Sequence, residues 1–467
     1  ETKTEKIELL FNQDGLWRIS DFTEDGRLLL ARDTGALTAE YFEWNPASRA
    51  LTPVVGQNEL EEYYVRYGVK PGEFFVLTPK FSDFRRLYLM KAGKFSPVSP
   101  EMESDVAAFD LDRVRKHLVY EVNDRGYTRL RAVDSRTLKP LVLPGFQEFG
   151  DVDHVYAGTM ARNGRSFVIG IETAKAPRTS YVYEWNTRKL TQWVIPSAPE
   201  IDTSNFTQAE LESYPARDGT PIPMFVRRPR SCETSESPCP VVVQFHGGPE
   251  EQARPGFSTR AQMLVEAGFI LVEPNVRGSD GYGKTWINAD NGSKRLNIIT
   301  DIEDCAIFVR KAWAKDGRTP KIGVIGGSYG GYSTLMAMTK FAGAYDAGVS
   351  IVGISNLLTF LNNTAPYRRV LRVTEYGDPE KDRDALLQLS ATNYLDRVKD
   401  PLMLIQGATD PRVPAGEAIQ VHAALQEKSI PSELIIFSDE GHGAEKRQNQ
   451  VLMLGHMIRF LKEHLLP

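Results

Sequence analysis

The chain has 467 residues, of which 41% are hydrophobic and 25% charged, a balance typical of folded globular proteins rather than disordered, collagenous or coiled-coil ones. At about 150 residues per domain, this length favours two or three domains. The formal net charge of −5 leaves no basic excess that would indicate nucleic-acid binding, and no apolar run reaches the roughly 18–20 residues that span a bilayer.

The first residue is Glu1 rather than Met, and the opening residues resemble neither a signal peptide nor a transit peptide. We therefore expect that the chain was processed or that an N-terminal stretch precedes it. This feature and the cysteines described below favour a periplasmic or secreted protein only slightly, and a cytoplasmic protein is the alternative.

Residues 1–200 are rich in short strands and turns. Four segments share a strand–turn–strand pattern and begin about 40–50 residues apart; they are residues 41–54, 87–98, 129–143 and 181–194. Another strand pair precedes each, as in residues 16–32 and 155–172. Four strands per repeat of this length predict a β-propeller, and an ordinary β-sandwich is the alternative. About four blades fit into residues 1–200, so either the propeller is small or the chain begins partway through a larger one.

A polar, proline-containing segment at 196–206 marks a boundary near residue 200. Residues 201–467 then alternate apolar strands with helices, which predicts a doubly wound, mostly parallel sheet covered on both faces. Amphipathic helices are expected over 297–316 and 451–466, and strands over 240–245, 269–276, 322–327, 347–353, 401–407 and 432–439.

Three cysteines are too few for a disulfide framework or a metal cluster. Cys232 and Cys239 bracket a polar loop, and the sequence leaves a local disulfide and two free thiols equally open. Cys305 lies in an apolar helical run, so we expect it in the core.

The sharpest motif is a G-x-S-x-G sequence at residues 326–330, between an apolar strand and a helical run. That setting is the nucleophile elbow of an α/β hydrolase, and it predicts Ser328 as the nucleophile. Asp410 and His442 each follow a later strand, in the order in which this fold supplies its acid and its base. Asp439 and Glu440 are the less favoured candidates for the acid.

The oxyanion of an acyl-transfer intermediate needs two backbone N–H donors. We expect one from Tyr329, the residue after the nucleophile. The other is expected from Gly248, in the His-Gly-Gly-Pro turn that follows the strand at 240–245. His246 has no accompanying metal ligand and is expected to hold that turn.

These residues resemble the prolyl oligopeptidase family of serine peptidases, in particular its acylaminoacyl-peptidase and dipeptidyl-peptidase branches. The matching stretches are residues 246–250, 275–286, 326–332, 352–361, 407–414 and 439–443. The resemblance implies Ser328, Asp410 and His442 as the triad, behind a β-propeller. It also implies that Tyr332, Val352 and Val413 line the pocket for the residue before the scissile bond, with core packing as the alternative for Tyr332 and Val352. It places Arg412 near the substrate backbone.

The chain departs from the family in showing about four blades where seven or so are usual, and no hydrolase segment is visible before the propeller. No propeller glutamate matches those that bind a free substrate N-terminus.

Three functions are open: a serine peptidase of short peptides, a carboxylesterase of the same fold, and a non-catalytic propeller binding protein. The expected partner is a peptide substrate, and a homo-oligomer is open. The chemistry needs no metal or organic cofactor. The residue preference stays open.

Overall fold

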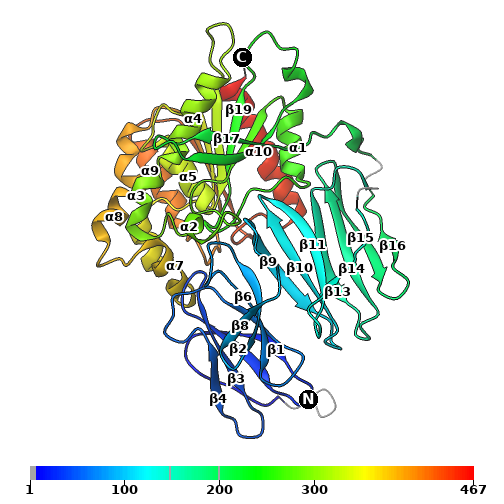
Figure 1. Ribbon diagram of the computed structural model, residues 1–467. Helices are drawn as coiled ribbons and strands as arrows, with labels where there is room; N and C mark the ends of the chain where they lie inside the picture. Colours follow the sequence, from blue (N-terminus) through cyan, green and yellow to red (C-terminus); the bar gives the residue numbers. More distant parts are fainter. Residues whose placement is uncertain (1–6, 147–148, 198–199, 467) are drawn as a thin grey trace.

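The computed structural model describes residues 7–146, 149–197 and 200–466 (Figure 1). The opening segment 1–6 and residues 198–199 of the predicted linker lie outside the described residues. Antiparallel strands occupy the first part of the chain, and a mixed sheet with helices occupies the second.

The first part contains four consecutive units, each pairing its strands in chain order. A single parallel pair, Thr128 with His154, links the third and fourth units. The units are β1 (Leu16–Phe22), β2 (Leu28–Asp33), β3 (Ala39–Trp44) and β4 (Leu51–Val55); β5 (Tyr64–Tyr67), β6 (Glu73–Thr78), β7 (Arg86–Lys91) and β8 (Lys94–Pro97); β9 (Asp105–Leu111), β10 (His117–Asp124), β11 (Tyr127–Asp134) and β12 (Pro140–Leu141); β13 (His154–Met160), β14 (Ser166–Thr173), β15 (Ala176–Glu184) and β16 (Lys189–Val194).

Successive units pack face to face, because alternate residues of each strand point to opposite sides. On β10, Leu118 and Tyr120 join the core shared with the second unit, whereas Val119 joins the core shared with the fourth. Residues in or next to the first strand of each of the four units line one cavity of about 330 Å³. This arrangement is that of propeller blades, as predicted, and differs from the two packed sheets of a sandwich.

The second part is built on one eight-stranded sheet. Strands β19 to β24 are parallel, and β17 and β18 extend the sheet as an antiparallel edge that the sequence analysis did not predict. In sheet order the strands are β17 (Glu210–Pro215), β18 (Pro221–Arg227), β20 (Ile270–Pro274), β19 (Val241–Phe245), β21 (Ile322–Gly327), β22 (Ala347–Ile351), β23 (Leu402–Gly407) and β24 (Ser432–Phe437).

Helices cover both faces of this sheet and bury a separate apolar core on each. One core holds α1 (Thr259–Glu266) and α10 (Arg447–Leu465). The other holds α4 (Asp301–Ala312), α5 (Tyr329–Met338), α6 (Leu357–Asn363), α8 (Arg383–Gln388) and α9 (Gly416–Glu427). The remaining helices are α2 (Lys284–Ile287), α3 (Arg295–Ile298) and α7 (Arg369–Tyr376).

One predicted helix needs correction. The segment 297–316 is not continuous: α3 ends at Ile298, α4 begins at Asp301, and Trp313 lies just beyond the end of α4. The break places Asp301 at the start of α4, where its carboxylate accepts hydrogen bonds from Arg277. Cys305 of α4 is fully buried, as expected.

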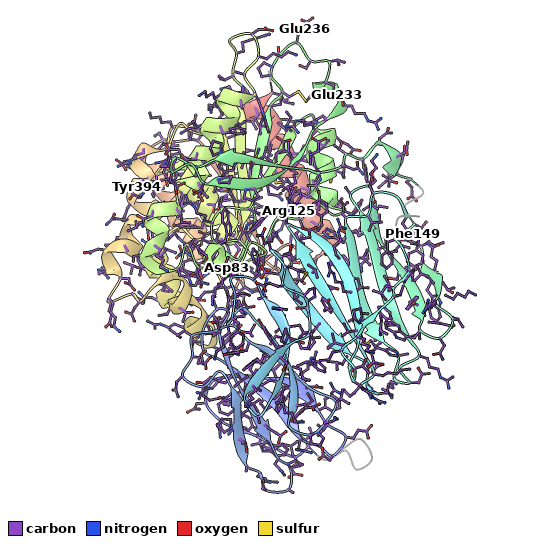
Figure 2. The ribbon with its side chains drawn as sticks, viewed as in Figure 1. Asp83, Arg125, Phe149, Glu233, Glu236 and Tyr394 are labelled. Carbon is purple, nitrogen blue, oxygen red and sulfur yellow. A yellow bond between two sulfur atoms is a disulfide. The ribbon has the colours of Figure 1, made fainter. Side chains whose placement is uncertain are left out.

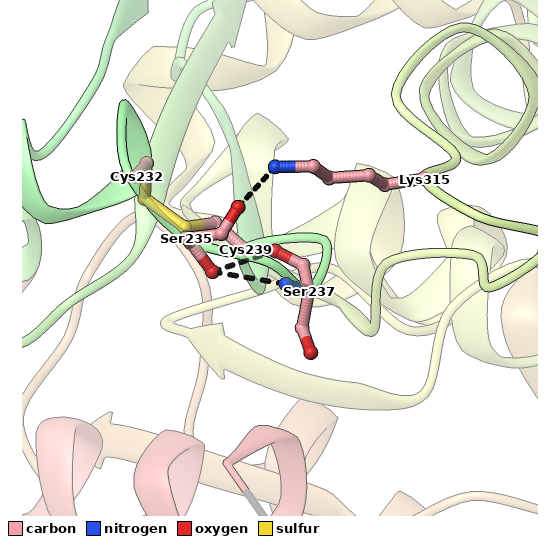
Figure 3. The surroundings of a disulfide bond; sticks show 5 residues. All are labelled: Cys232, Ser235, Ser237, Cys239 and Lys315. Atoms are coloured by element: carbon pink, nitrogen blue, oxygen red, sulfur yellow. Dashed lines mark hydrogen bonds between the residues drawn. A yellow bond between two sulfur atoms is a disulfide. The ribbon is translucent and has the colours of Figure 1, made fainter.

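Cys232 and Cys239 form a disulfide, with their Cα atoms 5.9 Å apart (Figure 3). Inside the closed loop, Ser235 Oγ donates to the carbonyl of Ser237 at 2.7 Å, and Lys315 donates to the carbonyl of Ser235. The sequence had left the disulfide and the free thiols open, and the structure contains the disulfide. None of the described helices combines the length and the apolarity needed to cross a bilayer.

Polar contacts join the antiparallel units to the α/β part. Asp83, at the border between the two parts (Figure 2), accepts hydrogen bonds from the backbone N–H and the hydroxyl of Thr285, both at 2.7 Å. The turn between β2 and β3 reaches α7, where the Ala36 N–H donates to Thr374 Oγ1 at 3.0 Å. That turn thereby comes to the edge of the cavity described next.

Candidate active site

Ser328 lies on the sharp turn between β21 and α5. Its backbone has φ 58° and ψ −114°, outside the regions that L-residues ordinarily occupy, and its N–H donates to the carbonyl of Ile351 at 2.9 Å. A serine in this conformation at a strand-to-helix junction is the nucleophile elbow that the motif predicted. The N-terminus of α5 follows at once, so the helix dipole favours negative charge beside Ser328.

The glycines of the motif allow the backbones around this turn to approach closely. A Cβ added at Gly326 would lie 2.3 Å from the backbone of Gly330, and one added at Gly330 would lie 2.1 Å from the carbonyl oxygen of Phe245. Neither distance is tolerable for a real side chain. The two glycines therefore hold α5 against β21 and β19.

Asp410 and His442 come together across the ends of two neighbouring strands. His442 Nδ1 lies 2.7 Å from Asp410 Oδ2. Asp410 follows β23 and is buried, and its Oδ1 accepts the backbone N–H groups of Arg412 at 2.8 Å and Val413 at 3.1 Å. These donors orient the carboxylate toward His442.

The two less favoured acids point elsewhere. Asp439 accepts hydrogen bonds from Lys446 and Asn449. Glu440 accepts from Asn449 Nδ2 at 2.7 Å and from the Lys446 N–H at 3.0 Å, so it holds the turn after β24. The contact with His442 thus belongs to Asp410.

Ser328 and His442 line one cavity of about 610 Å³. Gly247 and Gly248 line the same cavity, and a Cβ added at Gly247 would lie 3.7 Å from the Cβ of Ser328. Tyr329 begins α5, and the first N–H groups of a helix have no partner within the helix. The backbone donors expected at Tyr329 and Gly248 therefore both adjoin the space beside Ser328.

His246 ties the glycine turn to the loop after β20. Its Nδ1 lies 2.7 Å from the carbonyl of Gly247, and its Nε2 lies 2.7 Å from Ser279 Oγ. Burial lowers the pKa of His246, so the ring is neutral at pH 7. Within residues 7–146, 149–197 and 200–466, no group of three metal-ligating side chains forms around it or elsewhere.

The structure divides the four predicted pocket residues into two pairs. Val352 and Arg412 line the cavity, whereas Tyr332 and Val413 are buried in the core that contains α5. Val352 has φ 43°, which is a costly conformation for a β-branched residue. Placement alone does not assign a substrate contact, so all four roles stay predictions.

A buried ionic network beneath Tyr329 was not found from the sequence. Arg295 donates to Asp290 Oδ2 at 2.8 Å, to Glu375, and to Tyr329 Oη at 3.2 Å. Burial, with the nearby charge of Asp290, raises the pKa of Glu375 well above its ordinary value. Because Glu375 is 80 positions from Arg295 along the chain, no local pattern indicated that the two residues meet.

Two further sets of cavity residues were also not identified from the sequence. Ala36 and Leu37 come from the β2–β3 turn of the first blade, and Arg368 and Arg372 come from the segment at α7. The runs of residues around them carry no motif. The contact of the β2–β3 turn with α7, and the packing of α7 against α6, bring them to the cavity.

The fold and these contacts define an α/β hydrolase preceded by a β-propeller. Residues 255–467 match the model of the prolyl oligopeptidase family, and this part of the chain belongs to that family. The sequence-based resemblance to this family is thereby confirmed.

Curated relatives cover part of the chain. Dipeptidyl aminopeptidase BIII of Pseudoxanthomonas mexicana is 32% identical over 313 residues, which are 64% of this chain and 44% of the relative. Dipeptidyl peptidase family member 6 of Caenorhabditis elegans is 32% identical over 334 residues, which are 66% of this chain and 44% of the relative. The chain thus spans less than half the length of these two relatives.

Solved structures resemble nearly the whole chain. A puromycin-hydrolyzing peptidase of Mycobacterium tuberculosis superposes with a TM-score of 0.85 at 20% identity, over 98% of this chain and 71% of that one. An acylaminoacyl peptidase of Pyrococcus horikoshii gives a TM-score of 0.76 at 19% identity, over 97% and 72%. At these identities the likeness shows the fold, propeller included.

Proposed function

We propose that this protein is a serine peptidase that cleaves short peptides, with Ser328 as nucleophile, His442 as base and Asp410 as orienting acid. The observation that carries the proposal is the 2.7 Å contact between His442 Nδ1 and Asp410 Oδ2 at a cavity that Ser328 also lines. The family assignment favours a peptidase over the carboxylesterase and the non-catalytic binding protein.

The residues act in the following order. His442 Nε2 takes the proton of Ser328 Oγ, which attacks the scissile carbonyl carbon, while Asp410 holds the imidazole in the required tautomer. The N–H groups of Tyr329 and Gly248 stabilise the oxyanion. His442 then protonates the leaving amine, and water, activated by the same imidazole, hydrolyses the ester on Ser328.

Two observations support short peptides as substrates. The curated relatives at 32% identity are named as a dipeptidyl aminopeptidase and a dipeptidyl peptidase. In this chain the β2–β3 turn of the first blade reaches the edge of the cavity, at Ala36 and Leu37. A blade at the rim limits the access of folded proteins to Ser328.

A substrate panel tests the proposal. It compares dipeptidyl, acetyl-aminoacyl and internally blocked peptide anilides with nitrophenyl esters, for the parent chain and for Ser328→Ala. We expect amide hydrolysis by the parent and a loss of about 10⁴-fold or more in Ser328→Ala, because no other group replaces the nucleophile. Ester turnover without amide hydrolysis would identify a carboxylesterase, and retained activity in Ser328→Ala would refute the mechanism.

A further inference from the structure

Three arginines lie on one side of the cavity that holds Ser328 and His442. Arg368 ends the 3₁₀ turn η5 (Pro366–Arg368), Arg372 lies on α7, and Arg412 follows β23. Arg368 and Arg372 are four positions apart, so they project from the same face of a helical segment. We call these three residues the arginine cluster.

Two hydrogen bonds bring the cluster together. Thr364 Oγ1 donates to the carbonyl of Arg412 at 3.1 Å, and the Ala365 N–H donates to the carbonyl of Pro411 at 3.3 Å. The segment that leads into α7 is therefore attached to the loop that carries Arg412. Burial lowers the pKa of Arg368, and the charges of Arg372 and Arg412 lower it further, so both of these guanidinium groups lie close enough to repel that of Arg368.

The cluster lacks the counterions that the fully buried arginines have. Buried Arg295 pairs with Asp290 and Glu375, and buried Arg227 pairs with Glu273. In the described part of the chain, by contrast, no carboxylate lies within 4.0 Å of a guanidinium nitrogen of Arg368, Arg372 or Arg412. The Nε atoms of Arg368 and Arg372 are buried without a hydrogen-bond partner.

Two glutamates and a fourth arginine also line the cavity. Glu250 and Glu251 follow the glycine turn and line the cavity. Burial and the charge of Asp290 raise the pKa of Glu250, while Arg372 and Arg295 lower it, without a direct ion pair. Arg260 of α1 also lines the cavity, but the charge that acts on it is that of Glu273. Within the described residues, the cluster is thus a cationic surface without a direct ion pair, although Arg372 interacts with the charge of Glu250.

We propose that the arginine cluster binds a carboxylate of the peptide substrate, either an acidic side chain beside the scissile bond or a free C-terminal carboxylate. This inference rests on the proposed peptidase function and specifies its substrate class. A carboxylate in the cavity accepts hydrogen bonds from the guanidinium groups that line it, and its charge offsets the repulsion that Arg372 and Arg412 exert on Arg368. An uncharged analogue leaves these positive charges without a counterion, so it binds more weakly than the carboxylate.

Matched peptide pairs test the inference. Three pairs carry Glu or Gln at the first or second residue before the scissile bond or at the first residue after it, and a fourth pair ends in a carboxylate or an amide. For at least one pair, we expect kcat/KM of the parent chain to be at least about tenfold higher with the carboxylate. The pair that responds identifies the source of the carboxylate.

Variants on one helical segment show which arginines cause the preference for a carboxylate over an amide. Arg368→Gln and Arg372→Gln should bring the ratio within the responding pair toward one, and Arg372→Lys should keep part of it because the charge remains. Arg369→Gln is the matched control, since Arg369 is exposed on the same segment and does not line the cavity; it should keep the ratio of the parent. A ratio near one for all pairs, or a ratio that Arg368→Gln and Arg372→Gln leave intact, would overturn the inference.

A binding measurement separates this inference from the proposed function. Calorimetric titration of Ser328→Ala with each peptide pair should show tighter binding of the carboxylate member, and the Arg372→Gln change in that background should abolish the difference. If the parent hydrolyses nothing while this difference in binding is present, the peptidase proposal fails and the inference stands. If the parent hydrolyses peptides without a preference and binding shows no difference, only the inference fails.

Discussion

Two residues at the cavity hold backbone conformations that cost energy. Ser328 has φ 58° and Val352 has φ 43°, although neither is glycine or asparagine, and each such residue costs about 1–3 kcal/mol. Their N–H groups donate to the carbonyls of Ile351 and Ile405 at the ends of neighbouring strands. The parallel sheet thereby offsets the strain and aims both residues into the same space.

The role of the charge on Asp410 can be tested by a single substitution. Asp410→Asn keeps the size of the side chain but removes the charge that stabilises the His442 imidazolium, so kcat should fall about 10³–10⁴-fold. Glu440→Gln is the control, because Glu440 only holds a turn, and its kcat should stay within about tenfold of the parent. Steady-state kinetics on one peptide anilide checks both, and the reverse ranking would reassign the acid.

At the scale of elements, the site depends on how closely α5 lies against β21 and β19. Gly326 and Gly330 allow that approach, and α5 is buried along its whole length. Any side chain at Gly330 would push α5 away from β19. The position of Ser328 and the stability of the sheet therefore depend on the same contact.

Gly330→Ala should lower the free energy of unfolding by about 2–4 kcal/mol, because its Cβ would overlap the carbonyl of Phe245. The matched control is Gly455→Ala, at an exposed position of α10 where nothing lies within 4 Å of the new Cβ. There alanine should stabilise by up to about 1 kcal/mol. Urea denaturation measures both, and equal effects would contradict the close-approach argument.

At the scale of the whole molecule, we propose that the two parts are domains divided near residue 200, between β16 and β17. Their contact includes His154, which is fully buried: its Nε2 accepts the N–H of Gly256 at 3.1 Å, and its Nδ1 lies 3.0 Å from Thr128 Oγ1. Arg254 donates to the same hydroxyl at 2.8 Å. Burial, with the charges of Arg254 and Arg129, lowers the pKa of His154 to about 3.

This shift makes the stability of the protein sensitive to acid. An unfolded histidine takes up a proton below about pH 6.5, whereas His154 in the fold stays neutral until about pH 3. Between these values the unfolded state binds more protons, so the fold loses about 1.4 kcal/mol per pH unit from this residue. The free energy of unfolding is therefore highest above about pH 6.5, and the part that depends on His154 is lost as the pH decreases toward 3.

His154→Gln should remove this dependence, since Gln can still accept the N–H of Gly256 but does not titrate. Between pH 7 and pH 5, the parent should lose about 2 kcal/mol more unfolding free energy than the variant. His456→Gln, at an exposed position of α10, is the control for replacing a histidine. Equal losses in the parent and in His154→Gln would show that His154 does not contribute.

Much of the fold followed from local patterns. The strand predicted at 322–327 coincides with β21, and the repeated segments correspond to the third and fourth strands of each blade. The helix predicted over 297–316 was wrong in its continuity, because Asp301 begins a new helix where it pairs with Arg277. Strands β17 and β18 were missed, since their alternation is irregular and no motif lies near them.

The sequence by itself determined the two fold types, the elbow at Ser328 and the candidate partners Asp410 and His442. Strand and helix periodicity, turn glycines and motif order all act over a few residues, so they can be read along the chain. Only the tertiary structure decided that Cys232 and Cys239 join, that Arg295 connects Tyr329 with Glu375, and that Arg368 and Arg372 line the same cavity as Ser328. These contacts depend on how elements distant in sequence pack, and packing depends on the shape of the whole fold rather than on neighbouring residues.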